Sequence, residues 1–293
     1  MIQIKLNWES RLYNDYNLDS IAVYNKKIYI TCKSKNTILV LNLKGGFIRF
    51  IGNNLFNRPN GILILDNFMF ITERDSHRIH LYDLDKNVSI GVYGSNILKY
   101  PYGIKGFKIK GIYNIYVTDN KLKKVFNFNF KIINNKFYFK FIKSFGNNLK
   151  KLECLCIDKN YNRILISDEE EKNIQIYNLN GQYLKTIGNK MFLGDPEGMD
   201  LYKINEEEGI YITTDQTRNN NRFHLWDRKT LQYKETIYNK YVTNTDGICI
   251  SEDKKELYVI NTDLSVCSLE LIEKKNNKIL LLFPILLILR YLF

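Results

Sequence analysis

The chain has 293 residues, which is enough to bury a core in one large domain or in two ordinary ones. Its 43 Lys and Arg residues outnumber its 31 Asp and Glu residues, and the net charge of +12 favours polyanionic partners such as nucleic acid, anionic lipid or phosphorylated small molecules. An AT-rich coding sequence, which produces abundant Asn, Lys and Ile, could also account for part of this charge. Five cysteines without a CxxC spacing argue against a zinc site and against a disulfide framework.

Six segments recur in which a small residue precedes a short apolar run. In chain order they are LDSIAV from 18, RPNGILI from 58, YPYGIKG from 100, LECLCI from 152, DPEGMDL from 195 and NTDGICI from 244. The aligned small residues are 41, 42, 51, 44 and 49 residues apart, and they are Ser20, Gly61, Gly103, Cys154, Gly198 and Gly247. A period of about 40 to 50 residues built from short apolar runs is typical of a β-propeller.

Each unit continues with further β-rich runs. The second runs are KIYITC, FMFITE, NIYVTD, RILISD, GIYITT and ELYVIN, and the third are TILVLNL, RIHLYDL, KVFNFNF, NIQIYNL, RFHLWDR and SVCSLEL. In most units a fourth run follows, as in FIRFIGN and YLKTIGN. Alternating hydrophobicity and many β-branched and aromatic residues predict strands. The sequence therefore predicts an all-β fold, a six-bladed β-propeller with four antiparallel strands in each blade.

The last unit has only three predicted strands, which end near Leu271. We expect the N-terminal run IQIKLNWE to supply the missing outer strand, because this pairing closes the ring and removes an open sheet edge. The alternative is that the C-terminal run KILLLFPILLIL takes that place. The predicted division is a propeller domain over residues 1–275 and a hydrophobic tail over 276–293.

The apolar part of the tail, residues 279–293, is shorter than the roughly 20 residues that a membrane-spanning helix needs. With three lysines just before it, the tail could contact a membrane surface, or it could pack against the propeller. The first residues, MIQIKLNWES, lack the apolar core of a signal peptide. A cytoplasmic, monomeric protein is therefore the default expectation, with membrane association through the tail as the alternative.

The innermost strand of each propeller blade lines the central channel, so the residue before each aligned small residue should belong to one ring. All six of these residues are polar and four are carboxylates: Asp19, Asn60, Tyr102, Glu153, Glu197 and Asp246. The ends of the second strands should reach the same face and add Lys33, Lys35, Glu73, Arg74, Asp119, Lys121, Asp168, Glu169, Glu170, Asp215, Gln216, Asn261 and Asp263. Converging carboxylates repel one another unless a cation lies between them, and oxygen ligands without His or Cys indicate calcium. Each residue alone could instead accept hydrogen bonds from turn backbone.

At these residues the chain resembles the β-propeller phytases, in particular the bacterial branch that grades into NHL-type repeats. The resemblance covers most of residues 17–270. It runs through LDSIAV, RPNGILI with FITERDSHRIHLYDL, PYGI with IYVTD, LECLCIDKNYNRILISDEE, DPEGMDLY with TTDQTRNNNRFHLWDRKTL, and NTDGICI. The chain departs from the family pattern at Leu18, where the first of two paired Asp residues would stand, and at Cys154, where a glycine normally follows the Glu.

The resemblance implies calcium-dependent hydrolysis of phosphomonoesters such as phytate. It implies calcium ligands at Asp19, Glu153, Asp168, Glu169, Glu197 and Asp246, among which Glu153, Glu197 and Asp246 would be catalytic. It implies phosphate-binding residues at Lys33, Lys35, Arg74 and Arg78, with Tyr102 lining the site. The alternative is a non-catalytic, NHL-like propeller whose basic rim binds RNA or a protein partner. An acidic channel mouth would favour the metal-dependent enzyme, and a basic mouth would favour the binding module.

Overall fold

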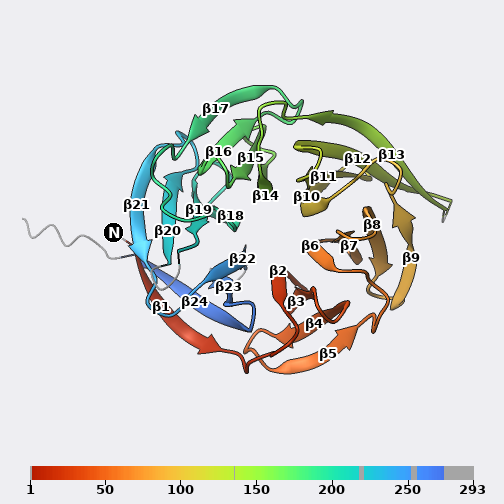
Figure 1. Cartoon of the computed structure of the whole chain (residues 1–293), viewed down its shortest axis with the longest axis horizontal. Helices are drawn as coiled ribbons and strands as arrows, with labels where there is room; N and C mark the ends of the chain where they lie inside the picture. The colour runs from red at the N-terminus through yellow and green to blue at the C-terminus, as the bar shows by residue number, and fades with distance from the viewer. Residues whose placement is uncertain (1, 135, 218–220, 252–255, 274–293) are drawn as a thin grey trace, which may run out of the picture.

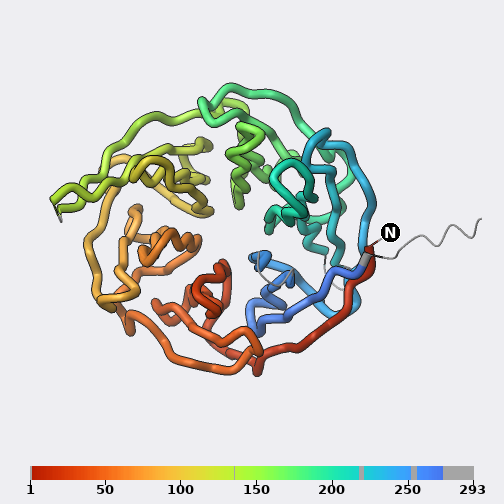
Figure 2. The backbone as a smooth tube through the Cα atoms, turned by 180° about the vertical axis from the view of Figure 1, so that it is seen from behind, coloured from red at the N-terminus to blue at the C-terminus, as the bar shows by residue number. Residues whose placement is uncertain are grey.

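The chain folds into a ring of six sheets around a central axis (Figure 1). The computed structural model describes residues 2–134, 136–217, 221–251 and 256–273, and within these ranges it contains 24 strands and no helix. Every sheet has four antiparallel strands. The predicted six-bladed β-propeller is therefore confirmed, and the view from behind shows the same closed ring (Figure 2).

Blades 1 to 5 each use four consecutive strands, running from the axis to the rim. Blades 1 and 2 contain β2 (Leu18–Tyr24), β3 (Lys27–Cys32), β4 (Thr37–Asn42), β5 (Phe47–Ile51), β6 (Pro59–Leu65), β7 (Phe68–Glu73), β8 (Arg78–Asp83) and β9 (Val88–Tyr93). Blades 3 and 4 contain β10 (Pro101–Ile109), β11 (Ile112–Asp119), β12 (Lys124–Ile133), β13 (Lys136–Phe145), β14 (Leu152–Asp158), β15 (Arg163–Asp168), β16 (Asn173–Tyr177) and β17 (Tyr183–Ile187). Blade 5 contains β18 (Met199–Lys203), β19 (Gly209–Asp215), β20 (Arg222–Asp227) and β21 (Tyr233–Tyr238).

Blade 6 combines both ends of the described chain. Its inner strands are β22 (Thr245–Ile250), β23 (Glu256–Asn261) and β24 (Ser265–Glu273), and its outer strand is β1 (Ile2–Glu9). Strand β1 pairs antiparallel with β24, from Ile2 opposite Glu273 to Glu9 opposite Cys267. Closure by the N-terminal strand is confirmed, and the competing run KILLLFPILLIL lies outside the described residues. The predicted domain boundary at 275 also lies outside them and stays a prediction.

The core is divided into six apolar clusters, each between two neighbouring blades. Between blades 2 and 3, for example, Phe70 and Phe128 are completely buried. The fourth strands face solvent, as the pattern of β5 shows, so hydrophobic burial holds the blades to one another instead of to a separate layer. Among the described residues no helix has the length and hydrophobicity to cross a membrane.

The recurring glycine is explained by how closely the innermost strands approach one another at the axis. A Cβ at Gly103 would lie 2.5 Å from the backbone oxygen of Glu153, and one at Gly198 would lie 2.6 Å from that of Asp246. Both oxygens belong to the next blade, so a side chain at either glycine would force the blades apart.

Hydroxyl groups on the second strands also link neighbouring blades, next to these glycine contacts. The Thr118 hydroxyl accepts a hydrogen bond from the backbone N–H of Gly103 at 2.8 Å and donates one to the backbone oxygen of Glu153 at 2.8 Å. Thr31 makes the same bridge from Ser20 to Asn60. These hydrogen bonds fix the positions of neighbouring ring residues relative to one another along the propeller axis.

Candidate functional site

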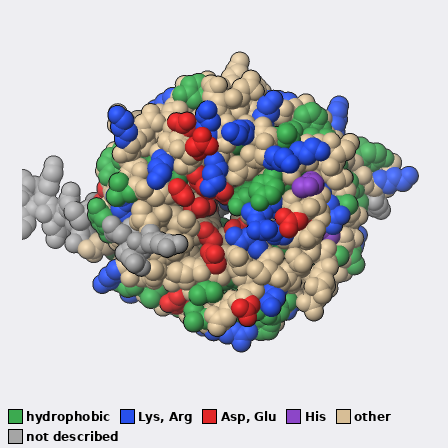
Figure 3. All heavy atoms as spheres, viewed as in Figure 1, with side chains coloured by type: hydrophobic (Ala, Val, Ile, Leu, Met, Phe, Trp, Pro, Cys, Tyr) green, Lys and Arg blue, Asp and Glu red, His purple; other side chains and the backbone are tan. Residues whose placement is uncertain are grey.

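The six ring residues converge on the mouth of the channel at one face of the propeller. They line a cavity of about 60 Å³ together with residues of the strands that follow them, and they are Asp19, Asn60, Tyr102, Glu153, Glu197 and Asp246. In Figure 3, acidic side chains gather on one side of the central opening, and basic and hydrophobic side chains lie on the other. The mouth therefore has both signs of charge, and its two halves differ.

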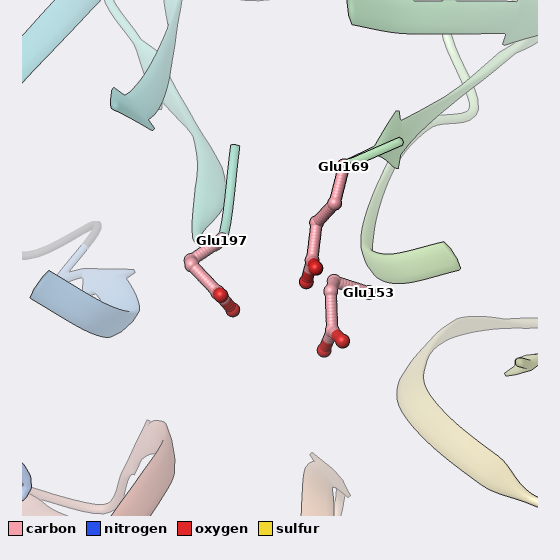
Figure 4. A group of neighbouring side chains, drawn as sticks. All are labelled: Glu153, Glu169 and Glu197. Carbon is pink, nitrogen blue, oxygen red and sulfur yellow. The ribbon is translucent and has the colours of Figure 1, made fainter. Parts of the chain in front are cut away.

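The acidic half is built by blades 4 and 5. Glu153 lies on β14, Glu169 directly follows β15, and Glu197 precedes β18. One carboxylate oxygen of each lies within 4.8 Å of the others, and Figure 4 shows the three carboxyl groups directed toward the same space. Lys151, from the segment before β14, forms an ion pair with Glu169. We call Glu153, Glu169 and Glu197 the glutamate cluster.

Burial and mutual repulsion disfavour the charged forms of these acids. The pKa of Glu153 is raised well above its usual value, by burial first and then by the charge of Glu197 and contact with Glu169. The pKa of Glu197 is raised by burial and then by Glu169 and Asp19. Asp246 behaves alike, since burial and its contact with Asp263 raise its pKa. Without a cation, burial and the neighbouring acids therefore disfavour the ionised forms of Glu153, Glu197 and Asp246.

The glutamate cluster fits a calcium ion. Calcium binds oxygen ligands at about 2.4 Å, so one ion can contact oxygens that lie up to about 4.8 Å apart. Glu169 Oε1 is buried and has no hydrogen-bond partner, which leaves an acceptor available for a ligand. Every donor in the cluster is a carboxylate oxygen, the type that hard cations prefer.

The other predicted calcium ligands are already engaged. Asp19 accepts hydrogen bonds from Lys33 Nζ at 2.9 Å and from Asn60 Nδ2 at 2.7 Å. Asp246 accepts one from Gln216 Nε2 at 2.9 Å. Both line the cavity but lie outside the glutamate cluster.

Asp168 has a different environment from the glutamates. Its carboxylate accepts hydrogen bonds from the backbone N–H groups of Lys150 at 2.8 Å and Lys151 at 3.1 Å. Asp119 and Asp215 hold the corresponding segments of blades 3 and 5 in the same way. The structure therefore gives these second-strand aspartates the role of fixing the loops that lead into the ring.

The basic half is centred on Arg74, of which only 5% is exposed. Its guanidinium donates a hydrogen bond to the Tyr102 hydroxyl at 2.8 Å and lies over the rings of Tyr100 and Tyr102, at 4.9 and 5.2 Å from their centroids. Arg74 Nε has no hydrogen-bond partner, and no carboxylate among the described residues lies within ion-pair distance. A buried cation without a counter-charge favours an anionic ligand.

The remaining predicted phosphate-binding residues are not all brought to the mouth. Lys33 lies there, and although burial works to lower its pKa, Asp19 and Asp246 outweigh burial and raise it. Lys35 is exposed and has its ammonium 5.9 Å from the ring centroid of Tyr16. Arg78 pairs with Glu73 at 2.6 Å, whereas Lys33 and Arg74 bond directly to the ring residues Asp19 and Tyr102.

Two histidines have geometry that resembles catalytic triads. His80 contacts Glu73 and Ser89, each at 2.7 Å, and His224 contacts Asp215 and Thr236 at the equivalent positions of blade 5. In blade 4 the equivalent residue is Gln175, which hydrogen-bonds to Asp168 and cannot act as a base. The repeated arrangement therefore ties the second, third and fourth strands together, and we assign it to the scaffold.

Sequence reasoning missed Lys151 and Tyr100. Lys151 lies two residues before a ring position, and Tyr100 lies two residues before another, so distance from the aligned small residue was the signal that could have found both. Their partners, Glu169 and Arg74, come from the ends of second strands.

No family model matches this chain, and no curated protein matches it. Solved structures do match. A chain of the nidogen/laminin complex aligns with a TM-score of 0.63 and 20% identity over 80% of this chain and 84% of that one. Virginiamycin B lyase from Staphylococcus aureus aligns with a TM-score of 0.61 and 14% identity, over 93% of this chain and 100% of the lyase. A catalytically inactive histidine-to-alanine variant of that lyase with quinupristin aligns equally well, at 0.61 and 15%. At these identities the similarity shows the fold alone.

Proposed function

We propose that the protein is a calcium-dependent hydrolase of phosphomonoesters, with phytate as the expected type of substrate. The observation that supports this most is the pairing of two unlike groups at one mouth. Three carboxylates of blades 4 and 5 lie within 4.8 Å of one another. The guanidinium of Arg74, which has no carboxylate partner among the described residues, hydrogen-bonds to Tyr102, a residue of blade 3 that lines the same mouth. A phosphate group bound between them would contact a cation on one side and Arg74 on the other.

The glutamate cluster would hold the calcium ion, because its oxygens converge and Glu169 Oε1 has no other partner. A bound calcium ion offsets phosphate charge and lowers the pKa of a coordinated water. Since burial raises the pKa values of Glu153 and Glu197, both side chains must lose protons before they can act as ligands. Calcium binding should therefore strengthen as pH rises.

Arg74 would orient the phosphate. Its free Nε can donate to a phosphate oxygen, and contacts with the rings of Tyr100 and Tyr102 and the hydrogen bond to the Tyr102 hydroxyl hold the guanidinium in place. Lys33 adds positive charge from blade 1. The cavity of about 60 Å³ has room for an ion with water, so the organic part of the substrate would remain in the open mouth.

The test is phosphate release from phytate with calcium and with excess chelator, for the native chain, Glu197→Gln and Glu170→Gln. Glu170 is exposed and next to Glu169 but outside the cluster, so it is a matched control. We expect turnover only with calcium, a loss of at least about a hundredfold for Glu197→Gln, and no change for Glu170→Gln. Calcium-independent turnover, or none in any condition, would contradict the proposal, and the second result would favour the non-catalytic binding module.

The lyase similarity supports a different chemistry less well. The inactive lyase variant lacks a histidine, whereas no histidine lines the mouth cavity in the described part of this chain. His80 and His224 are buried within their blades and fully hydrogen-bonded there. The residues at this mouth therefore favour metal-assisted hydrolysis over histidine-dependent elimination.

A further inference from the structure

The positive charge of the chain is concentrated in one segment. Residues 86–152 contain fourteen lysines, no arginine and a single acid, Asp119, which gives a formal charge of +13. The whole chain has a net charge of +12, so the remaining residues are close to neutral. Coding-sequence bias would spread lysine along the chain and does not explain this local excess.

The segment forms blade 3 and its flanks, and blade 3 is unusually long. Strands β12 and β13 have 10 residues each, whereas the third and fourth strands of blades 1, 2, 4 and 5 have five or six. In Figures 1 and 2 the β12–β13 hairpin extends beyond the circumference of the ring. Because β12 starts at the face that carries the mouth, it ends at the opposite face, and the far end of the β12–β13 hairpin lies there.

Aliphatic side chains are exposed at this far end. Ile109 is 52% exposed and Ile133 is 50% exposed, and Ile132, on the opposite face of the sheet from Ile133, is 38% exposed. The register places Ile109 opposite Ile112, Ile112 opposite Lys131, and Lys131 opposite Tyr138, so these residues form one row at the end of β10 and β11, and β12 and β13 extend two residues beyond it. We call this row, with Ile132 and Ile133, the blade 3 tip.

Lysines surround these apolar side chains. Lys110, Lys131 and Lys136 are exposed, and no described carboxylate lies within ion-pair distance of them. An exposed apolar group within a ring of lysines is the pattern of proteins that insert a few side chains into an anionic lipid surface.

The aromatic residues of the hairpin argue against nucleic acid as the partner. Phe128 and Phe130 are completely buried, Phe137 stacks on Phe130 at 5.5 Å, and Phe139 stacks on Tyr93 at 4.7 Å. Phe141 is 39% exposed but contacts the rings of Phe126 and Phe128. Among the described aromatic residues of the hairpin, Tyr138 is therefore the one ring that is half exposed, and a single open ring does not form a row of stacking platforms for bases. The absence of arginine also removes the side chain that best recognises bases and backbone phosphates.

The end of the described chain lies on the same face as the tip. Strand β24 starts at Ser265, on the mouth side, and ends at Glu273 on the opposite side. The sequence continues with residues 274–293, which include the apolar run ILLLFPILLILRYLF. The described chain therefore ends at the face opposite the candidate active site, which is the face that carries the blade 3 tip.

We propose that the blade 3 tip binds an anionic lipid surface, with Ile132 and Ile133 inserted among the lipids and Lys110, Lys131 and Lys136 contacting the headgroups. This orientation leaves the mouth directed away from the membrane and open to soluble substrate. The proposal does not depend on calcium or on hydrolysis.

The test is co-sedimentation of the full chain with vesicles of phosphatidylcholine alone or of phosphatidylcholine and phosphatidylserine in equal parts. The variants are Ile132→Asp with Ile133→Asp, and Lys131→Glu with Lys136→Glu. The controls are Leu193→Asp and Lys190→Glu, two exposed residues in the loop between blades 4 and 5, at the mouth face. Thermal unfolding of each variant checks that it is folded.

We expect binding to the phosphatidylserine vesicles that weakens with salt, falls at least tenfold in both tip variants and is unchanged in both controls. Equal binding by the tip variants and the native chain would overturn the proposal, because the C-terminal tail would then suffice. Salt-sensitive binding to single-stranded RNA, lost in the Lys→Glu variant, together with no vesicle binding, would also overturn it.

Discussion

The two halves of the mouth hold buried charge in opposite ways. On the acidic side, Glu153 and Glu197 can lose their charge by protonation, and their raised pKa values show that burial favours this. On the basic side, Arg74 cannot lose its proton, and it is stabilised by the faces of two tyrosines instead of a carboxylate. The acidic half can therefore lose charge by taking up protons when no cation is bound, whereas the basic half keeps its positive charge whether or not an anion is bound.

Replacing a cluster glutamate should have the largest effect. Glu153→Gln should lower calcium affinity at least about tenfold, or ~1.4 kcal/mol, because it removes a charged ligand oxygen. The same change should raise the free energy of unfolding of the metal-free protein, because it removes one of three crowded carboxyl groups. Calcium titration calorimetry and denaturant unfolding in chelator would measure the two effects, and a fall in both quantities would contradict the comparison.

The pH dependence should separate the halves. An acid whose folded pKa is raised stabilises the fold at low pH and loses that contribution as pH rises above its unfolded value, about 4.5 for Glu, toward the folded one. The metal-free protein should therefore become less stable as the pH rises above about 4.5. Calcium should flatten this dependence, because it stabilises the ionised cluster. Urea unfolding at several pH values, with calcium or chelator, checks this, and stability that rises with pH in chelator would be inconsistent.

Arg74→Met should leave stability almost unchanged, within about 1 kcal/mol, because no ion pair is lost, a single hydrogen bond to the Tyr102 hydroxyl is removed, and an apolar side chain can pack against the two tyrosines. Phosphate or phytate should bind at least about tenfold more weakly, ~1.4 kcal/mol. Arg58→Met is the matched control, since Arg58 is exposed and pairs only loosely with Asp75 at 3.8 Å. Strong destabilisation by Arg74→Met with unaltered anion binding would show that Arg74 is structural.

The smallest effect should come from Lys33→Met. It breaks the 2.9 Å pair with Asp19, but Asn60 still donates to that carboxylate. We expect a loss of about 1 kcal/mol in the free energy of unfolding, because the pair is largely but not fully buried. Lys33→Arg should restore most of it. Denaturant unfolding measures this, and a loss as large as that for a core truncation would mean that Lys33 supports the whole mouth.

The sequence predicted the fold because propeller blades repeat. The spacing of small residues located six first strands, and the three-stranded last unit required an outer strand that only a terminus could supply. The ring residues could be predicted for the same reason, since Glu153 and Glu197 occupy aligned positions. Residues at the same position of each repeat lie at the same level along the propeller axis, so aligning the repeats was enough to predict the ring.

What the alignment could not give is how side chains pair. Asp168 and Glu169 are adjacent in sequence, yet one accepts backbone hydrogen bonds and the other points into the mouth. Arg74 and Arg78 both follow β7, but only Arg78 has a carboxylate partner. These differences depend on which neighbour lies within about 3 Å, and strand periodicity does not specify that distance.

The pairing of β1 with β24 also concerns the order of events during synthesis. Strand β1 is synthesised before the other strands, but its partner β24 follows only after more than 250 further residues. Strand β1 therefore stays unpaired until the last blade has been synthesised. Such a long-range contact slows folding, and the open ring exposes strand edges that can pair with other chains. Removal of the first nine residues after synthesis should likewise reopen the ring at a single seam, between blades 6 and 1, and make the protein prone to aggregate.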